Sequence, residues 1–514
     1  MQPRRASLRK SDTRFFAALH RLCPCKAALV AGYRRYKETE NRNTNTKDIF
    51  MEQQTQARMQ NKTAATNETT AMHTSTGAAE DAQKQEAQDM GTRRCTDAST
   101  SRRETPPARK QKHPAAKNFP KPNPWIYYPA SVIVRLFLRF KLKTRYDIKA
   151  LKGIRGPAFI VCPHVSNIDF LLVAVALLPH RPTFVVSQHF MTHPKIRWIL
   201  EKMHVIPKKM FCPDIKTILS IMRAKESGNL IVLFPEGRLT CFGHSLQVTD
   251  GTADLVKKLA VPVYMISEDG AYKSFPKWGK AGFRPGRILV RAEKLLEADA
   301  IPAMSLKEVQ AVLERAVLHD EDKLFPDVRY RCKSPALGLD GILYKCPSCL
   351  AEFRMQTDAR HIRCTACGFS AELDETYRLH GAPFTHINDW YFWQESLLDL
   401  AIPLESKTVL AAVGPDGNMD KNAGAGLIYM DRDVIRYTGT CFGKPLAFTE
   451  KTEDIKAFPA SVAAHFDIYH KKQLYNMHLR PDPRAVIKWV SYLDKLTRER
   501  ETAAKNAEAD NQNG

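Results

Sequence analysis

The residues with the clearest capacity for chemistry are a histidine and an aspartate five positions apart, His164 and Asp169. In the stretch CPHVSNIDFLLVAVALL, His164 follows an apolar strand-like run and Asp169 begins an apolar helical run. Five residues on one helix would leave the side chains about 140° apart, so they can meet only if His164 lies on the turn before the helix. Pro163 and the capping-type residues after it favour such a turn. The carboxylate could then hold one imidazole nitrogen and leave the other as a general base.

A histidine and an aspartate at this spacing also occur by chance, and the alternative is a helix cap beside an incidental histidine. A second motif about 70 residues later favours catalysis. There the strand-like run NLIVLF leads directly into Pro235, Glu236, Gly237 and Arg238. Gly237 permits a backbone excursion, and the charged residues beside it could bind an anion and a hydroxyl. The alternative for this motif is a surface turn with an ion pair.

Together with VPV at 261–263, these motifs resemble the glycerolipid acyltransferases, the family of lysophosphatidic acid, glycerol-3-phosphate and lysophospholipid acyltransferases. The resemblance covers roughly residues 125–300. It implies an O-acyltransferase in which His164 is the catalytic base and Asp169 orients it. It also implies that Glu236, Gly237 and Arg238 bind the acceptor. A thioester donor already activates the acyl carbon, so a general base suffices and no serine or cysteine nucleophile is needed.

The family resemblance further implies an acyl-CoA or acyl carrier protein donor and a lysophospholipid acceptor, with 1-acyl-glycerol-3-phosphate giving phosphatidate as the first expectation. One departure concerns Arg238, which follows Gly237 directly where the commonest family form has a small hydroxyl residue between them. The forms FPEGRLT, HVSNID and TDGTADL are more similar to the branch that acylates 2-acyl-glycerophosphoethanolamine. Lys208 could replace the arginine of a further family motif. The headgroup, the acyl chain length and the choice of donor therefore stay open.

The elements that must position these motifs alternate between strand and helix over residues 119–330. The expected strands are the apolar runs 158–162, 183–187, 229–234, 261–267 and 287–293. Helical segments such as 214–226 and 250–260 lie between them. This alternation predicts an α/β domain with a central mixed sheet flanked by helices.

The acyltransferase-like segment begins with WIYYPASVIVRLFLRFKLK at 125–143. Its helical pattern puts apolar residues on one face and Arg135 and Arg139 on another; the apolar set is Val132, Ile133, Leu136, Phe137 and Phe140. This pattern, led by aromatic residues, predicts an interfacial helix that contacts membrane lipids. The alternative is an ordinary helix that covers the domain core. The longest apolar run, Phe170–Leu178, is about half of a spanning helix, so we expect peripheral binding at the inner face of a membrane.

A metal module follows at 340–371. Two CxxC pairs, Cys346 with Cys349 and Cys364 with Cys367, are separated by 14 residues. Four thiolates at this spacing predict a zinc ribbon, and a site filled by four cysteines is structural rather than catalytic. The other cysteines are scattered and no secretory signal is evident, so a reducing cytoplasmic setting fits best.

The remaining chain predicts a connecting helix at 385–404, a strand-rich module at 405–500 and a disordered tail at 501–514. Asp482 and Pro483 would open a final amphipathic helix. Its apolar stripe comprises Val486, Trp489, Val490, Leu493 and Leu496. Strands closed by such a helix resemble the PH/GRAM-like fold.

The first 118 residues predict a disordered basic tail, because they are rich in Thr, Gln, Asn, Ala and Lys and almost lack aromatic residues after residue 41. Alternatively the start codon is placed too far upstream. Residues 1–120 hold 23 Lys and Arg against 12 Asp and Glu, so they supply +11 of the net charge of +23. The basic charge allows a second class of function, a zinc-ribbon scaffold with an inactive acyltransferase domain. The ribbon lacks the interleaved aromatic residues of a single-strand binding face, so no nucleic-acid partner is expected; the oligomeric state stays open.

Overall fold

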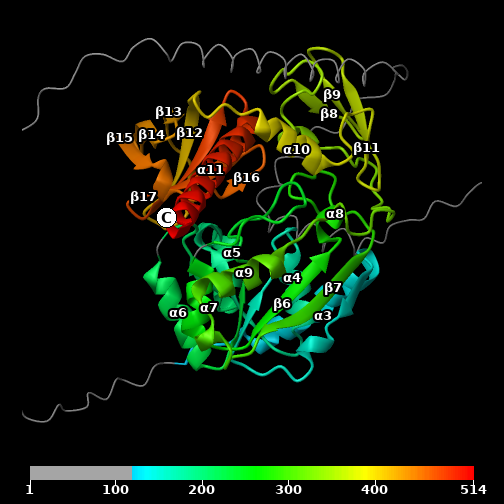
Figure 1. Cartoon of the computed structure of the whole chain (residues 1–514), viewed down its shortest axis with the longest axis vertical. Coiled ribbons are helices and arrows are strands. Elements are labelled where there is room, and N and C mark those ends of the chain that lie inside the picture. The colour runs from blue at the N-terminus through cyan, green and yellow to red at the C-terminus, as the bar shows by residue number, and fades with distance from the viewer. Residues whose placement is uncertain (1–117, 213, 250, 514) are drawn as a thin grey trace, which may run out of the picture. The chain divides into compact units, whose positions relative to one another are not determined.

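The structure is a computed structural model that describes residues 118–212, 214–249 and 251–513. Three sheets with their helices make up this part of the chain (Figure 1). The prediction of a disordered tail over residues 1–118 lies outside the described residues, apart from Asn118 at its end.

The first sheet has seven strands in the order β1-β7-β6-β2-β5-β3-β4. Neighbouring strands are parallel except β6 and β7, which pair antiparallel, so the predicted mixed sheet is confirmed. The strands are β1 Thr144–Asp147, β2 Ala158–Val161, β3 Thr183–Ser187, β4 Ile206–Lys208, β5 Leu230–Leu233, β6 Val263–Asp269 and β7 Ile288–Leu296. Strands β2 and β5 lie side by side, which brings the two sequence motifs to the same sheet edge.

Helices cover both faces of this sheet, because alternate residues of its strands point to opposite sides. Ile160 of β2 joins a core with α3 and α4, whereas Phe159 and Val161 join another with α6, α7 and α9. The helices are α3 Pro124–Lys141, α4 Asp169–Ala176, α5 Pro194–Lys202, α6 Ile215–Glu226, α7 Gly251–Leu259, α8 Ala271–Ser274 and α9 Leu306–Val317. Short 3₁₀ turns lie at η2 Lys149–Leu151, η3 Gln188–Thr192 and η4 Ile301–Ala303.

Helix α3 begins beside Asn123, whose side chain accepts a hydrogen bond from the backbone N–H of Trp125. Its expected apolar face is largely exposed, with Trp125 at 87% and Phe140 at 76% of full exposure. Phe137 differs from the prediction, because its ring packs inward against Phe283 at 5.2 Å between centroids. No helix in the described ranges combines the length and the apolar character that a membrane crossing requires.

The second sheet belongs to the cysteine module and has the order β11-β10-β9-β8. Its strands are β8 Met355–Thr357, β9 His361–Cys364, β10 Ser370–Leu373 and β11 Leu379–His380, preceded by η5 Leu339–Gly341. The module shares one continuous core with the first domain. Buried Arg284 donates to the Tyr377 hydroxyl at 2.6 Å, and that hydroxyl donates to the Lys273 carbonyl at 2.6 Å. The module is therefore packed on the acyltransferase-like domain.

The connecting helix, α10, spans Ile387–Ser396 and is shorter than the predicted 385–404, because the chain turns at Leu397 and Pro403 precedes the next strand. The third sheet is antiparallel, with the order β15-β14-β13-β12-β18-β17-β16. Its strands are β12 Leu404–Val413, β13 Met419–Met430, β14 Val434–Cys441, β15 Lys444–Lys451, β16 Ala460–Ser461, β17 His465–His470 and β18 Gln473–Arg480, with η6 Thr452–Asp454 between β15 and β16.

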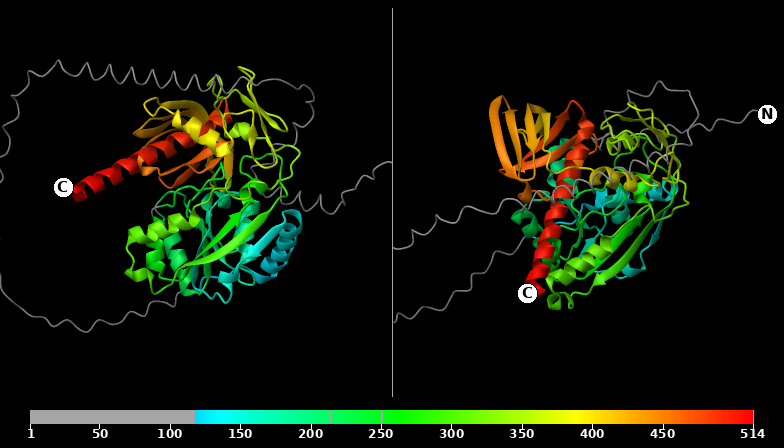
Figure 2. Two further views of the ribbon diagram at one scale, coloured as in Figure 1. Left: turned by 45° about the vertical axis from the view of Figure 1, so that its right-hand side comes forward. Right: turned by 45° about the horizontal axis from the view of Figure 1, so that its top comes forward.

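The final helix, α11 Val486–Asn513, follows the turn η7 Pro483–Ala485 and lies against one face of the third sheet (Figure 2). The Asp482 side chain accepts from the backbone N–H of Arg484, as the capping pattern predicted, and the whole apolar stripe is buried. A strand-rich module closed by a helix is confirmed. The prediction of a disordered tail from residue 501 is wrong, because an Ala- and Glu-containing sequence with good helix propensity continues α11 to Asn513.

Candidate active site

His164 lies on the turn between β2 and α4, as its pairing with Asp169 requires. Its Nδ1 is 3.0 Å from Oδ2 of Asp169, and its ring stacks on Phe234 with 4.5 Å between centroids. The histidine side chain is 28% exposed, whereas the aspartate is fully buried. A carboxylate at this distance accepts the Nδ1 proton, which leaves Nε2 as the basic nitrogen.

Asp169 is held by the same turn that carries the histidine. Its Oδ2 also accepts the backbone N–H groups of Val165 and Ser166, each at 2.8 Å. Its other oxygen, Oδ1, has no hydrogen-bond partner within the described part of the chain. Burial raises the pKa of Asp169, and its bonds to His164 and to the backbone oppose that shift. The carboxylate thus fixes both the imidazole and the turn.

Glu236 anchors the histidine from the neighbouring strand. Its Oε1 accepts the backbone N–H of His164 at 2.8 Å, and its Oε2 accepts that of Leu246 at 2.6 Å. The backbone N–H of Thr240 donates in turn to the His164 carbonyl at 3.0 Å. The turn after β5 therefore binds both the backbone N–H and the carbonyl of His164. In this geometry Glu236 positions the turn that carries His164, and its predicted contact with an acceptor stays a prediction.

Gly237 occupies the one position of this turn where a side chain would fit poorly. Its φ of +72° is in the left-handed region that favours glycine. A Cβ here would approach the ring of Phe211 to 3.0 Å and the methyl of Met210 to 3.3 Å. The glycine therefore allows the turn to pass close to the loop after β4.

Three buried carboxyl groups lie close together near His164, and they belong to Asp169, Glu236 and Glu268. Burial raises the pKa of Glu236 to about 8, although its two backbone N–H bonds oppose the shift. Glu268 lies on β6 and was not expected from the sequence. Burial, followed by repulsion from Asp169 and Glu236, raises its pKa well above the ordinary value. Neither of its oxygens has a hydrogen-bond partner among the described residues, so the uncharged acid is favoured at neutral pH.

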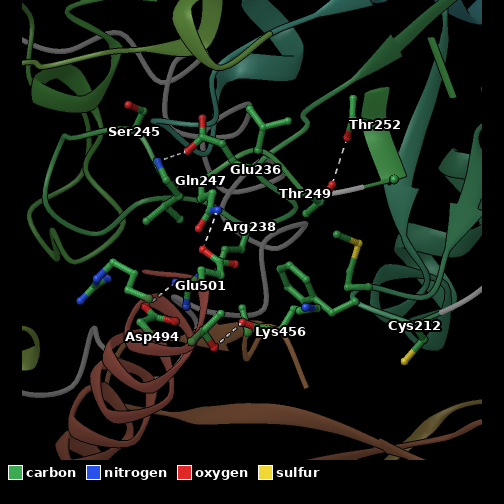
Figure 3. Close-up of a pocket in the computed structure, with 18 of the residues that line it drawn as sticks. Cys212, Glu236, Arg238, Ser245, Gln247, Thr249, Thr252, Lys456, Asp494 and Glu501 are labelled. Atoms are coloured by element: carbon green, nitrogen blue, oxygen red, sulfur yellow. Dashed lines mark hydrogen bonds and ion pairs between the residues drawn. The ribbon is translucent and has the colours of Figure 1, made fainter. Parts of the chain in front are cut away.

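Arg238 forms an ion pair with Asp494 of α11, and its guanidinium also donates to the Phe458 carbonyl at 3.4 Å. Both side chains of the pair are nearly buried. The sequence allows a turn with an ion pair as the alternative for the motif at 235–238, and this contact is such an ion pair. The sequence did not indicate Asp494 as the partner. The pair lies in a cleft of about 1770 Å³ between the turn after β5, the loop after β4 and helices α10 and α11 (Figure 3).

The same cleft is lined by Lys208, the residue proposed to replace a family arginine, and by Glu236 and Phe211. His164 and Asp169 are not among its lining residues. The cleft therefore meets the turn after β5 at Glu236 and Arg238. It offers room beside the guanidinium for a bound group.

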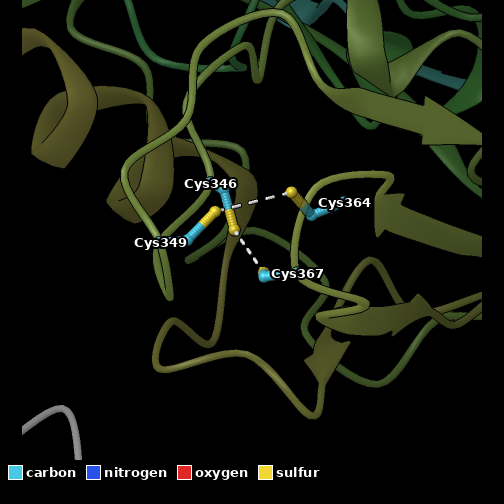
Figure 4. Close-up of side chains that lie close together, drawn as sticks. All are labelled: Cys346, Cys349, Cys364 and Cys367. Carbon is cyan, nitrogen blue, oxygen red and sulfur yellow. Dashed lines mark hydrogen bonds between the residues drawn. The ribbon is translucent and has the colours of Figure 1, made fainter.

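The four cysteines point toward one another (Figure 4). Their sulfurs all lie within 4.8 Å, with 3.7 Å between Sγ of Cys346 and Cys367 and between Sγ of Cys349 and Cys364. Thiolates around one tetrahedral zinc lie about 3.8 Å apart. The backbone N–H of the residue after each pair, Leu350 or Gly368, donates to the carbonyl of the first cysteine at 3.0 Å. The predicted ligand set is brought together by two similar turns, and it could hold zinc.

Several site residues have no local sequence pattern. Glu268 reads as an ordinary strand residue, and Asp494 reads as a polar position on an amphipathic helix. Both reach the site through folding: Glu268 because β6 pairs with β2, and Asp494 because α11 comes close to the turn after β5. A single sequence carries no signal for such contacts.

The chain is similar to known proteins over part of its length. Residues 140–267 match a family model described as Acyltransferase. Over 182 residues the chain is 22% identical to the 1-acyl-sn-glycerol-3-phosphate acyltransferase of Bacillus subtilis (strain 168), across 34% of this chain and 88% of that protein. A solved structure, the 1-acyl-sn-glycerophosphate (LPA) acyltransferase PlsC from Thermotoga maritima, is 18% identical with a TM-score of 0.32, across 38% of this chain and 78% of that one. The family match spans His164, Asp169 and the turn at 235–238.

Proposed function

We propose that this chain, whose residues 140–267 match the Acyltransferase family model, transfers a fatty acyl group from acyl-CoA or acyl carrier protein to the free hydroxyl of 1-acyl-glycerol-3-phosphate, giving phosphatidate. The observation that carries the proposal is the 3.0 Å contact between Nδ1 of His164 and Asp169. The choice of acceptor is supported by similarity to the 1-acyl-sn-glycerol-3-phosphate acyltransferase of Bacillus subtilis.

The proposed reaction needs only one base. Nε2 of His164 removes the hydroxyl proton as the oxygen attacks the thioester carbon, forming a tetrahedral intermediate. Collapse of the intermediate breaks the carbon–sulfur bond, and the imidazolium returns the proton to the departing thiolate. Asp169 stabilises the positive imidazolium, because its carboxylate is buried and already oriented by two backbone N–H groups. A positioned base of this kind contributes about 10²–10⁴-fold.

For the acceptor phosphate we propose Arg238. Its guanidinium can make paired, charge-assisted hydrogen bonds to phosphate. It lies beside the catalytic turn and lines the cleft. On binding, the phosphate would replace Asp494 as the ion-pair partner of the Arg238 guanidinium.

We propose two further roles. The four cysteines hold one structural zinc, because their sulfur separations of 3.7 Å fit a single tetrahedral ion and no position is left for water. Helix α3 rests on a membrane surface, because Trp125, Val132, Leu136 and Phe140 are exposed beside Arg135 and Arg139. The acceptor is itself a membrane lipid, so the helix would bring the site to its substrate.

Purified full-length protein assayed with three acceptors and two donors tests the proposal. The acceptors are 1-acyl-glycerol-3-phosphate, 2-acyl-glycerophosphoethanolamine and glycerol-3-phosphate, each with acyl-CoA and acyl carrier protein. We expect the highest kcat/KM with 1-acyl-glycerol-3-phosphate. A preference for the ethanolamine lipid would replace the acceptor and support a role in remodelling. If no acyl group is transferred to any acceptor, the proposed enzymatic activity is contradicted. That result would favour the scaffold alternative.

A further inference from the structure

A second group of potential metal ligands lies where the acyltransferase domain meets the C-terminal module. His189 comes from η3, directly after β3. His465 and Asp467 come from β17 of the third sheet. One ligand atom from each of these three residues lies within 4.8 Å of the other two. None of them belongs to the catalytic turn or to the cysteine module.

The separations are those of ligands that share an ion. Nδ1 of His189 is 3.5 Å from Oδ2 of Asp467, and Nε2 of His465 is 3.6 Å from Oδ1. An N–H···O hydrogen bond spans about 2.7–3.2 Å, as the His164–Asp169 contact does. Nitrogen and oxygen ligands about 2.0–2.1 Å from one tetrahedral zinc lie about 3.3–3.4 Å apart. The two contacts with Asp467 are therefore too long for good hydrogen bonds and close to the spacing around a metal.

The surroundings support the same conclusion. Nδ1 of His189 is buried and has no hydrogen-bond partner among the residues that the structure describes. Asn476 donates to Oδ1 of Asp467 at 2.6 Å, which is the kind of bond that orients a metal-binding carboxylate.

Two further imidazoles flank this group. The ring of His193 lies 5.4 Å from that of His189, and the ring of His478 lies 4.9 Å from that of His465, measured between centroids. A water molecule could occupy a fourth position. Imidazole nitrogens with a single carboxylate suit zinc and related transition metals, whereas magnesium and calcium prefer oxygen ligands.

We propose that His189, His465 and Asp467 bind a divalent transition-metal ion, zinc in the first instance, which fastens the acyltransferase domain to the C-terminal module. The ligands come from both sides of the contact between the two domains, so the ion would cross-link the domains. This second site has nitrogen and oxygen ligands, in contrast to the four sulfurs of the cysteine module. It does not depend on the proposed acyltransferase reaction.

Metal analysis of the full chain tests this site. Protein purified without chelators and dialysed against metal-free buffer should retain about two zinc ions per chain, one for each closed or nearly closed ligand set. His465→Ala and Cys364→Ser should each lose about half of the zinc, and the double variant should lose nearly all of it. His470→Ala is the matched control, because His470 lies on the same strand and pairs with Glu450; it should keep the full content.

Zinc-edge X-ray absorption of the wild-type protein gives a second readout that requires no variant to fold. The average zinc shell should contain nitrogen or oxygen ligands as well as sulfur. A purely sulfur shell, or a single zinc per chain that His465→Ala leaves in place, would overturn the proposal. Loss of half the zinc in His465→Ala and not in His470→Ala would support it.

Discussion

Two of the regions where histidine meets aspartate differ in distance and in origin. In the turn between β2 and α4, His164 and Asp169 are 3.0 Å apart and belong to one short segment. At the domain contact, His189 and His465 lie 3.5 and 3.6 Å from Asp467 and come from two domains. The first distance is that of a hydrogen bond, and the second leaves room for a shared ion. We therefore propose that the same residue types serve different chemistry according to their spacing.

The two regions also differ in what holds the carboxylate. Asp169 accepts two backbone N–H groups from its own turn, so its position is set locally. Asp467 accepts from the side chain of Asn476 on the neighbouring strand, and its histidine partner His189 depends on how two domains pack. Substitutions should therefore separate catalysis from the metal content and from domain stability.

The largest effect should come from Asp169→Asn. The amide can present an N–H to the imidazole, and it no longer stabilises the imidazolium, so kcat/KM should fall by about 10²–10⁴-fold. The zinc content should stay unchanged, because this residue is remote from both ligand sets. Steady-state kinetics with metal analysis of the same sample checks both points, and Asp299→Asn, at an exposed position, is the control. Activity within a few-fold of wild type would show that Asp169 has no role in the mechanism.

Next in size should be the effect of Cys364→Ser on stability. Losing one ligand of a closed site should remove about one zinc ion per chain and cost on the order of several kcal/mol. The melting temperature of the whole chain should fall, because the cysteine module shares a core with the acyltransferase domain. Below the new melting temperature, kcat should stay near that of wild type.

The matched control for the cysteine module is Cys332→Ser, which changes a cysteine outside the cluster. It should keep both the zinc and the melting temperature. A Cys364→Ser protein with unchanged zinc content and unchanged stability would contradict the structural zinc.

A smaller effect is expected at Arg238, which pairs with Asp494. Arg238→Lys keeps the charge beside Asp494 but loses the planar fork, so the acceptor KM should rise about tenfold while the donor KM changes little. Asp494→Asn removes the ion-pair partner and should lower the melting temperature while sparing the acceptor KM. If both Michaelis constants rise equally and the melting point falls with them, Arg238 does not bind the phosphate. It would then only stabilise the turn.

The smallest effect should be on membrane binding by α3. Phe140→Asp replaces a side chain that is 76% exposed, and it should weaken binding to vesicles with anionic lipid by about tenfold. Co-sedimentation of the full chain measures the change. Leu318→Asp, an equally drastic change at another exposed apolar residue, is the control. Binding that neither variant alters would argue that α3 is an ordinary surface helix.

The sequence indicated those features whose determinants lie close together in the chain. The alternation of apolar runs indicated five of the seven strands of the first sheet but not β1 or β4, and the short spacings indicated the His164–Asp169 turn and the four-cysteine cluster. It did not indicate Glu268, Asp494 or the histidines at the domain contact, because their neighbours are set by strand order and by domain packing. The extent of α11 was missed because a polar composition suggested disorder where helix propensity prevails.

The central claim is that His164 is the base in acyl transfer to a lysophospholipid, and His164→Ala tests it most directly. Initial rates of transfer to 1-acyl-glycerol-3-phosphate are compared between wild type and variant, with circular dichroism and zinc content measured on the same samples. Less than about a hundredth of wild-type turnover should remain, with folding and zinc unchanged. Turnover above that level in a folded, zinc-loaded variant would contradict the account.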